Sequence, residues 1–154
     1  LPVYIRKDNN EIKGIALPVA GKGLWSTIFG YIALNPDTDS VLGIQFYKHG
    51  ETPGLGGEVE KKWFTDNFIN HPQEDSSGSI TYVPKKIRDS NGKIVSIKVV
   101  KGGVDYSDTN MESIHQVDGI SGATVTADGV TDFLLEDLLR YEKTLDKIRD
   151  YGTI

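Results

Sequence analysis

DGISGATVT, residues 118–126, precedes the longest helix-like run of the chain, which extends from Val130 to about Asp150. The stretch combines two glycines and an alanine with three hydroxyl side chains, and small residues let a backbone approach a bulky ligand closely. A helix that begins here directs unpaired N–H groups and its positive dipole end at the occupant of the turn. The stretch therefore predicts a strand-to-helix turn suited to a phosphate.

Ordinary helix capping is the alternative interpretation of the same stretch, because Ser, Thr and Gly are common before an apolar-periodic run. The capping box needs Glu or Gln three positions after the hydroxyl residue. Ser121, Thr124 and Thr126 all lack that partner. One cap hydroxyl is enough for a helix, whereas this turn carries three, so both interpretations stay open on composition alone.

The order of residues in this turn also resembles the flavinylation motif of FMN-binding domains. In those families FMN is joined through its phosphate to the threonine that ends Ser-Gly-Ala-Thr, a position that Thr124 holds here. The resemblance implies covalent FMN on Thr124. The other motif positions are Asp118, Gly119, Ser121, Gly122, Ala123 and Thr126.

A second unusual stretch, HGETPGLGGE, occupies residues 49–58 and contains four glycines. Such a loop leaves backbone N–H and C=O groups open to the edge of a flat heteroaromatic ring, although a Pro-Gly turn entering a helix is an equal alternative. His49 and Glu51 are metal-ligand types, but no further ligand follows at a suitable spacing, so we predict no metal site.

A third stretch, GKGLW, places Lys22 between two glycines at residues 21–25. The P-loop pattern is missing, so a turn that bends into the next strand is the preferred interpretation. Trp25 suits either the core or a ligand ring, and the core is preferred. Lys101, at a strand end, suits either solvent or a phosphate or flavin carbonyl, and solvent is the more usual case.

Taken together and in order, the three stretches resemble the soluble domain of the C subunits of the bacterial sodium-pumping NADH:quinone oxidoreductase (Nqr). The G subunits of the Rnf electron-transport complex are the nearest alternative, and GKGLW favours the Nqr family. The resemblance implies that the flavin ring lies against residues 52–56. The expected cofactor-binding residues are Trp25, Glu51, Thr52, Pro53, Gly54, Leu55, Gly56 and Lys101.

The same resemblance implies an assembly around this chain. An N-terminal membrane helix, missing from this sequence, would hold the domain at the outer, periplasmic face of the cytoplasmic membrane. A flavin transferase would install FMN from FAD. The other Nqr subunits would complete a sodium-transporting NADH:quinone reductase, in which this domain passes single electrons and neither oxidises NADH nor pumps sodium alone.

Composition excludes several other classes. The chain has 154 residues, a net charge of −5 and no basic cluster, which argues against a nucleic-acid partner. It has no cysteine, which excludes disulfides, thiol catalysis and cysteine-ligated clusters. No run approaches the roughly 20 apolar residues of a membrane span.

Periodicity and turn signals predict an α+β fold with mostly antiparallel sheet, packed helices and a long C-terminal helix. We expect residues 1–154 to form a single FMN-binding domain. The helices are expected over residues 58–70 and 130–150, the second with Leu135 and Leu139 widening its apolar face. The strands are expected over residues 2–6, 11–19, 26–34, 41–48, 80–87 and 93–101, with a polar loop over 73–79 and Asn91-Gly92 as a hairpin turn.

Two other functional classes are weighed against the flavin domain. A non-enzymatic binding or scaffold module would use Thr124 only as a helix cap. A hydrolase would use Thr124 or Ser121 as nucleophile, but the histidines carry no nucleophile signature; these are His49, His71 and His115. Acids near the motif would repel a phosphate, so the flavin interpretation predicts that at least Asp128 faces solvent or a basic partner.

Overall fold

The computed structural model describes residues 1–107 and 111–152. Its main sheet is antiparallel with the order β1-β2-β3-β4, formed by Tyr4–Asp8, Glu11–Lys22, Thr27–Leu34 and Val41–Lys48. A hairpin pairs β5 (His71–Glu74) with β6 (Ile80–Val83), and a parallel pair joins β7 (Lys98–Val100) to β8 (Gln116–Asp118). The helices are α1 (Lys62–Thr65) and α2 (Thr124–Tyr151), with 3-10 turns η1 (Gly56–Glu60), η2 (Asp66–Phe68) and η3 (Glu112–His115).

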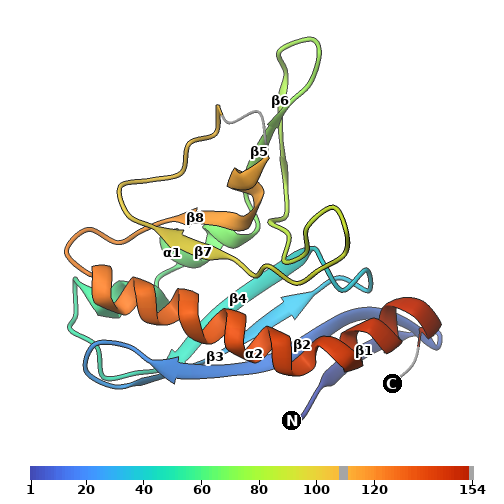
Figure 1. The fold of residues 1–154 in the computed structure, drawn as a ribbon, viewed down its shortest axis with the longest axis horizontal. Helices are drawn as coiled ribbons and strands as arrows, with labels where there is room; N and C mark the ends of the chain where they lie inside the picture. Colours follow the sequence, from blue (N-terminus) through green and yellow to red (C-terminus); the bar gives the residue numbers. More distant parts are fainter. Residues whose placement is uncertain (108–110, 153–154) are drawn as a thin grey trace.

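The long helix α2 runs along the main sheet and covers one of its faces (Figure 1). In β3 every second side chain from Ile28 to Leu34 is buried, the period expected of a strand with one face on the core. The apolar stripe of α2 meets this face at Val130, Phe133, Leu134, Leu138, Tyr141, Leu145 and Ile148, all of which are buried. The predicted core face of the C-terminal helix is therefore confirmed.

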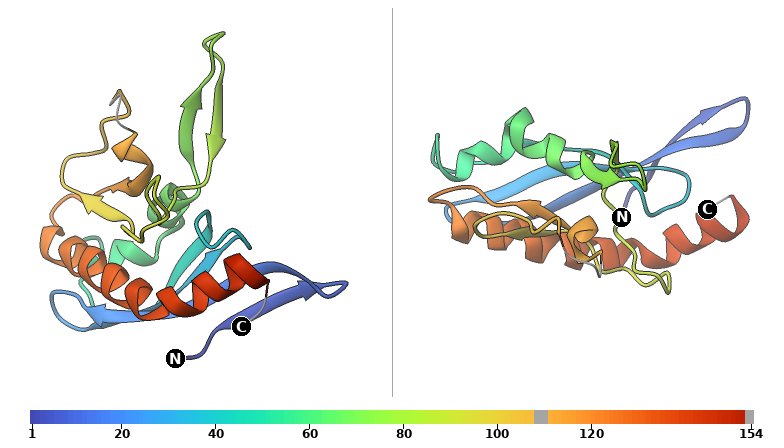
Figure 2. Two further views of the ribbon diagram at one scale, coloured as in Figure 1. Left: turned by 45° about the vertical axis from the view of Figure 1, so that its right-hand side comes forward. Right: turned by 90° about the horizontal axis from the view of Figure 1, so that it is seen from above.

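The remaining elements lie around this sheet-and-helix unit. In the view from above, α1 and α2 lie on opposite long sides of the molecule (Figure 2). The β5–β6 hairpin projects beyond the other elements (Figure 1). Antiparallel pairs dominate the sheets, and a long helix ends the described chain. The predicted α+β class is confirmed.

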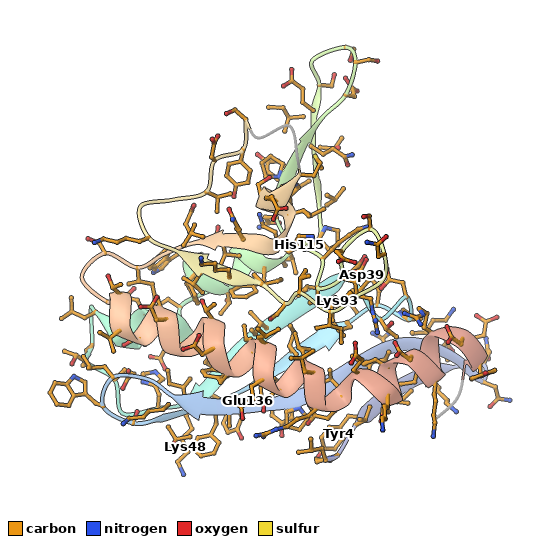
Figure 3. All side chains as sticks on the ribbon, in the orientation of Figure 1. Tyr4, Asp39, Lys48, Lys93, His115 and Glu136 are labelled. Carbon is orange, nitrogen blue, oxygen red and sulfur yellow. The ribbon has the colours of Figure 1, made fainter. Side chains whose placement is uncertain are left out.

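The face of the main sheet that α2 does not cover carries a row of aromatic rings. Tyr31 stacks on Tyr47 with centroids 5.4 Å apart and meets Tyr4 edge-on at 6.1 Å. Lys48 extends over the Phe29 ring. Figure 3 labels Tyr4 and Lys48 on the side of the sheet turned away from β5–β8. These cross-strand pairs stabilise a solvent-facing sheet surface.

The prediction of one continuous helix over residues 58–70 is wrong. Three short helical turns replace it, because Lys61 has extended backbone angles (φ −77°, ψ 143°) between η1 and α1. The break lets Val59 and Phe64 both face the core although five positions separate them. The sequence pattern of such a helix also places Trp63 on its apolar side, but Trp63 is 50% exposed and donates its Nε1–H to Glu58 Oε2.

The hairpin expected around Asn91-Gly92 is wrong in its pairing, since β6 pairs with β5 and β7 with β8, and an isolated antiparallel bridge between Arg88 and Ile94 spans the turn. Both strands are also shorter than predicted. β6 ends at Val83 because Pro84 has no N–H for a ladder, and β7 begins only at Lys98 because Ser96 has a positive φ of 64°. A tight turn forms here, but Gly92 N–H donates to the Asp89 carbonyl at 3.0 Å, so its central residues are Ser90 and Asn91 rather than Asn91 and Gly92. The loop expected over residues 73–79 begins later than predicted, because residues 73 and 74 belong to strand β5 of the β5–β6 hairpin.

The width of the α2 apolar face was also overestimated. Leu135 and Leu139 are 38% and 44% exposed, because they lie on the flank of the helix rather than toward the sheet. The helix begins at Thr124, six residues before the predicted start, and so includes the end of the central motif.

Gly129 sets how closely α2 approaches β2. A Cβ at this position would collide with the Lys22 carbonyl oxygen and lie 3.3 Å from Gly23 Cα. Backbone atoms cannot move aside as a flexible side chain can. The missing side chain therefore allows the first turns of the helix to rest directly on the end of the strand.

We predict that Gly129→Ala lowers the free energy of unfolding by about 1–3 kcal/mol, the range for overpacking, although alanine normally stabilises a helix interior by about 1 kcal/mol. Urea unfolding followed by circular dichroism measures the change. Gly43→Ala is the control, because nothing lies within 4 Å of its added Cβ. Equal or higher stability of Gly129→Ala would contradict the close approach.

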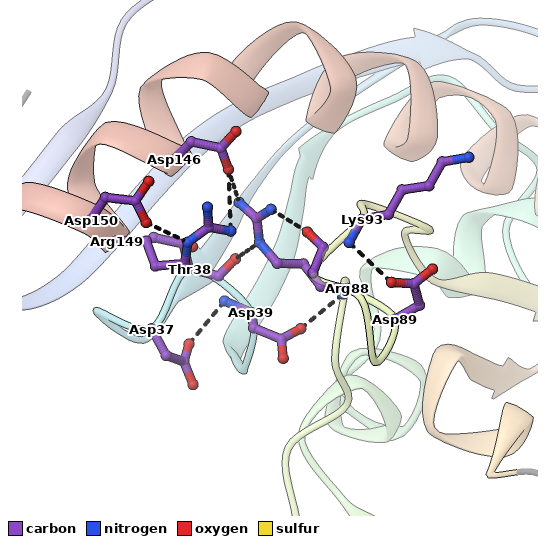
Figure 4. Close-up of polar contacts among 10 residues, drawn as sticks. Asp37, Thr38, Asp39, Arg88, Asp89, Lys93, Asp146, Arg149 and Asp150 are labelled. Atoms are coloured by element: carbon purple, nitrogen blue, oxygen red, sulfur yellow. Dashed lines mark hydrogen bonds and ion pairs between the residues drawn. The ribbon is translucent and has the colours of Figure 1, made fainter.

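A buried arginine joins three parts of the fold. Arg88 Nε donates to the Thr38 carbonyl at 3.1 Å and its Nη1 donates to the Gly92 carbonyl at 2.8 Å. Its Nη2 lies 3.1 Å from Asp146 Oδ1, an ion pair without hydrogen-bond geometry (Figure 4). Asp39 Oδ1 also accepts the Arg88 backbone N–H. The β3–β4 turn, the segment after β6 and the C-terminal part of α2 are thereby tied together.

We predict that Arg88→Met lowers the free energy of unfolding by about 2–4 kcal/mol, because two backbone carbonyls lose their donor and Asp146 loses its ion-pair partner. The control is Arg149→Met, since Arg149 pairs with Asp146 and Asp150 at the surface and should cost less than about 1 kcal/mol. Equal urea midpoints for the two variants would show that the buried Arg88 guanidinium group stabilises the fold no more than the surface Arg149 does.

Candidate functional site

The parallel pairing of β7 with β8 brings two distant loops together. Parallel strands end at the same edge of their sheet, so the loop after Val100 and the loop after Asp118 leave side by side. Between them and the start of α2 lies a cavity of about 730 Å³, within the range of small-molecule sites. Its lining residues are Val99, Lys101, Gly102, Gly103, Val104, Asp105, Tyr106, Asp118, Gly119, Ile120, Ser121, Gly122, Thr124, Ala127 and Asp128.

The N-terminus of α2 faces this cavity without a side-chain cap from the described residues. Ala123 is the N-cap and has no side-chain acceptor, while Thr124 is the first helical residue. Thr124 is therefore not the cap that the capping interpretation required. Its exposed side chain lines the cavity with Ser121, beside the open N–H groups of the first turn.

Glu51 holds the central motif to the loop between β2 and β3. Its carboxylate accepts the backbone N–H groups of Leu24, Trp25 and Ser26 at 2.6, 2.9 and 3.1 Å. It also accepts the hydroxyls of Ser26 and Thr126 at 3.1 and 2.9 Å. Glu51 is only 5% exposed, and both of its oxygens are engaged inside the protein.

Burial alone would raise the pKa of the Glu51 carboxyl, but hydrogen bonds outweigh it and the pKa is lowered. The donors are the N–H groups of Leu24 and Trp25 and the hydroxyls of Thr126 and Ser26. The carboxylate therefore stabilises the fold above its ordinary pKa of 4.5. That contribution is lost as the pH falls through the lowered folded-state pKa.

Several predicted ligand-binding residues lie beside the cavity rather than in its lining. A Cβ at Gly122, where φ is +75°, would lie 3.0 Å from Leu55 Cδ2, so Leu55 borders the motif. Gly56 packs against the Thr126 hydroxyl. Trp25 is 71% exposed, which makes its preferred assignment to the core wrong. The other three predicted loop residues, Thr52, Pro53 and Gly54, are exposed and outside the lining.

Lys101, predicted to bind the cofactor although it lies outside the central motif, is in the cavity lining, where it is exposed. Asp118 also lines the cavity, and its Oδ1 accepts the Val104 backbone N–H at 2.8 Å, which fixes the facing loop. Asp128 is exposed, as predicted, but it belongs to the lining of the same cavity, where its charge opposes that of Lys101. Sequence reasoning missed Tyr106, and the Gly102-Gly103 pair was the available signal for a loop that turns back over a site.

None of the three histidines lies where it could act as the base of a hydrolase that uses Thr124 or Ser121 as nucleophile. His49 Nε2 lies 3.1 Å from Glu60 Oε2, His71 is buried beside Lys85, and His115 Nδ1 contacts the Lys86 carbonyl. All three are outside the cavity lining, so the hydroxyls of the cavity have no histidine base there. Within residues 1–107 and 111–152, no group of three His, Asp or Glu side chains could hold a metal ion.

These features fit a phosphorylated ring ligand. Gly122, whose positive φ favours glycine, brings bare backbone to the cavity lining, the helix start offers uncapped N–H groups, and Lys101 adds a positive charge. The sequence profile of the FMN-binding domain family matches residues 23–137. The chain belongs to the FMN-binding domain family.

Relatives of this FMN-binding domain share one name. The C subunit of the Na(+)-translocating NADH-quinone reductase of Vibrio vulnificus strain YJ016 is 42% identical over 153 residues, covering 97% of this chain and 52% of that protein. The C subunit of the same reductase of Pseudomonas aeruginosa is 39% identical over 133 residues, covering 86% and 44%. The chain thus spans about half the length of these curated relatives.

Solved structures share its fold. The crystal structure of the C subunit of the Na(+)-translocating NADH-quinone reductase from Parabacteroides distasonis superposes with a TM-score of 0.73 at 32% identity, covering 93% of this chain and 61% of that one. NqrC from Shewanella oneidensis gives 0.72 at 31% identity, covering 96% and 60%. Among the described helices of this FMN-binding domain, none is long and apolar enough to cross a membrane.

We predict that Glu51→Gln lowers the free energy of unfolding of the flavin-free chain by about 2–4 kcal/mol at pH 7, since the neutral amide cannot accept all five hydrogen bonds. The difference should narrow as the pH falls below 4.5 and through the lowered pKa of Glu51, because the wild-type carboxylate then becomes protonated. Urea unfolding over a series of pH values measures it. Glu60→Gln, at an exposed carboxylate, is the control, and equal loss in both variants would contradict a special role for Glu51.

Proposed function

We propose that the chain is the FMN-carrying domain of the C subunit of a sodium-translocating NADH:quinone reductase, with FMN bound covalently through its phosphate to Thr124. The carrying observation is the exposed Thr124 hydroxyl at an uncapped helix start inside a cavity. Family membership supports the cofactor, and the names of the relatives above support Nqr rather than Rnf.

The residues of the turn would hold the phosphodiester. The first N–H groups of α2 and the Ser121 hydroxyl are suited to bind its single negative charge. Lys101 offers a counter-charge across the cavity. The Thr126 hydroxyl, although part of the motif, donates to Glu51 and holds the helix start in place.

The flavin ring would use the cavity beside this anchor. Tyr106 and Ile120 provide apolar walls, and Gly102 and Gly103 leave backbone groups open to the edge of a ring. Leu55, next to Gly122, borders the same space. The remaining predicted loop residues, from Thr52 to Gly54, and Trp25 stay proposed contacts at its outer side. FMN supplies one-electron redox chemistry when bound, while the protein supplies placement and electrostatics.

Thr124 would take part in one covalent step, its own modification. Its Oγ would form a bond to the phosphorus of the FMN half of FAD as the pyrophosphate bond breaks and AMP leaves. The hydroxyl proton would pass to a base of the flavin transferase that catalyses the step. A covalent anchor prevents loss of the cofactor at the outer face of the membrane, where the proposed N-terminal helix would hold the domain beside the other Nqr subunits.

We expect the intact mass of the chain to rise by FMN minus water after co-expression with a flavin transferase in exported form. Thr124→Ala should show no gain, because the nucleophilic oxygen is missing. Mass spectrometry of both proteins makes the measurement.

Thr144→Ala is the matched control, since Thr144 lies on the same helix outside the cavity lining and should be modified as fully as wild type. No gain in the wild type, with the transferase active on a known acceptor, would refute the proposed function and leave a binding or scaffold module.

A further inference from the structure

Lys85 is a fully buried lysine that the proposed attachment site does not use. Its exposed fraction is 0%, although lysine is almost never fully buried without partners. Its Nζ donates to the Ser113 carbonyl at 3.1 Å and lies 3.0 Å from His71 Nδ1. It also lies 4.9 Å from the centroid of the Tyr106 ring. The ammonium is thus fixed by contacts from three separate segments.

The position of this ammonium relates it to the cavity. Tyr106, which the ammonium faces, lines the cavity, and so does Asp118. Asp118 attracts the Lys85 charge, and its Oδ1 also holds the cavity loop through the Val104 N–H. Lys85 itself is outside the lining. A positive charge therefore lies directly behind one wall, where burial leaves it poorly screened by salt.

We propose that Lys85 is a positioning residue that acts through Tyr106 and Asp118 to favour electron addition to a flavin in this cavity. The inference rests on the proposed function, because it requires the flavin on Thr124. An added electron brings negative charge, and a fixed cation nearby stabilises that charge more than it stabilises the oxidised ring. By reciprocity, reduction raises the affinity of Lys85 for its proton.

The titration of Lys85 makes this coupling visible in an accessible pH range. Burial lowers the pKa of Lys85 to about 8, against the opposing effect of Asp118. Below that pH, one electron enters from an external donor and Lys85 keeps its proton. Just above it, the same electron is accompanied by a fraction of a proton from solvent that binds Lys85 Nζ, since a fivefold to tenfold coupling is too weak for uptake of a whole proton. Reduction potential should therefore fall more steeply with pH just above about pH 8, where Lys85 titrates.

The other titratable groups that face Lys85 are Tyr106, His71 and Asp118. Burial, and then Asp118, raises the pKa of the Tyr106 phenol above its ordinary 10. These groups and the flavin are the same in a variant with arginine at position 85, so a slope that the wild type shows and Lys85→Arg lacks reports the lysine.

The test is a spectroscopic redox titration of the flavin-loaded chain with dithionite between pH 7 and 9.5. In Lys85→Met at pH 7 we expect the oxidised-to-reduced ratio at a fixed potential to rise about fivefold to tenfold, and the extra slope above pH 8 to vanish. Lys85→Arg keeps the charge at every pH, so it should retain a wild-type potential at pH 7 without the extra slope. Lys86→Met is the control, because Lys86 is exposed and pairs with Asp39.

The outcomes separate failure of the proposed function from failure of the proposed role of Lys85. Absence of flavin on the wild type by mass would refute the proposed function and this inference with it. Flavin present with identical potentials and slopes in wild type, Lys85→Met and Lys86→Met would refute only the role of Lys85. If Lys85→Met fails to fold, the wild-type pH series and Lys85→Arg decide, since a purely structural lysine gives no extra slope in either.

Discussion

The carboxylate of Glu51 is the interaction on which the site depends. It satisfies three backbone N–H groups of the β2–β3 loop and, through Thr126, the first turn of α2. A buried charge is tolerated because its lone pairs are taken up by donors. The helix start, the loop over residues 23–26 and the glycine-rich loop before η1 are consequently held as one rigid corner of the molecule (Figure 1).

Rigidity at this corner has a chemical consequence for Thr124. Because Thr126 supplies the link to Glu51 and Ala123 occupies the cap position, the Thr124 hydroxyl stays exposed in the cavity. The three hydroxyls of the motif therefore divide their roles between structure and proposed binding. A nucleophile placed on a fixed helix end requires little further ordering when a modifying enzyme engages it.

Charge is distributed on both sides of the cavity. Lys101 and the dipole of α2 provide positive potential at its surface, and Lys85 lies behind its wall. Asp118 balances this charge and fixes the facing loop at the same time. A site for a phosphate and for an added electron is thus compatible with a chain whose net charge is −5, because local placement rather than net charge sets the potential there.

The sequence by itself determined the α+β class, the apolar stripe of α2 and the strand-to-helix turn at Thr124, because these depend on local periodicity and turn chemistry. Only the tertiary structure decided that Glu51 reaches Thr126, 75 residues away, and that Trp25 lies at the surface. It also decided the parallel pairing of β7 with β8, which forms the cavity from two loops far apart in the chain. Hydrogen bonds and strand pairings between distant segments leave no periodic signal in sequence, since their geometry exists only once the chain has folded.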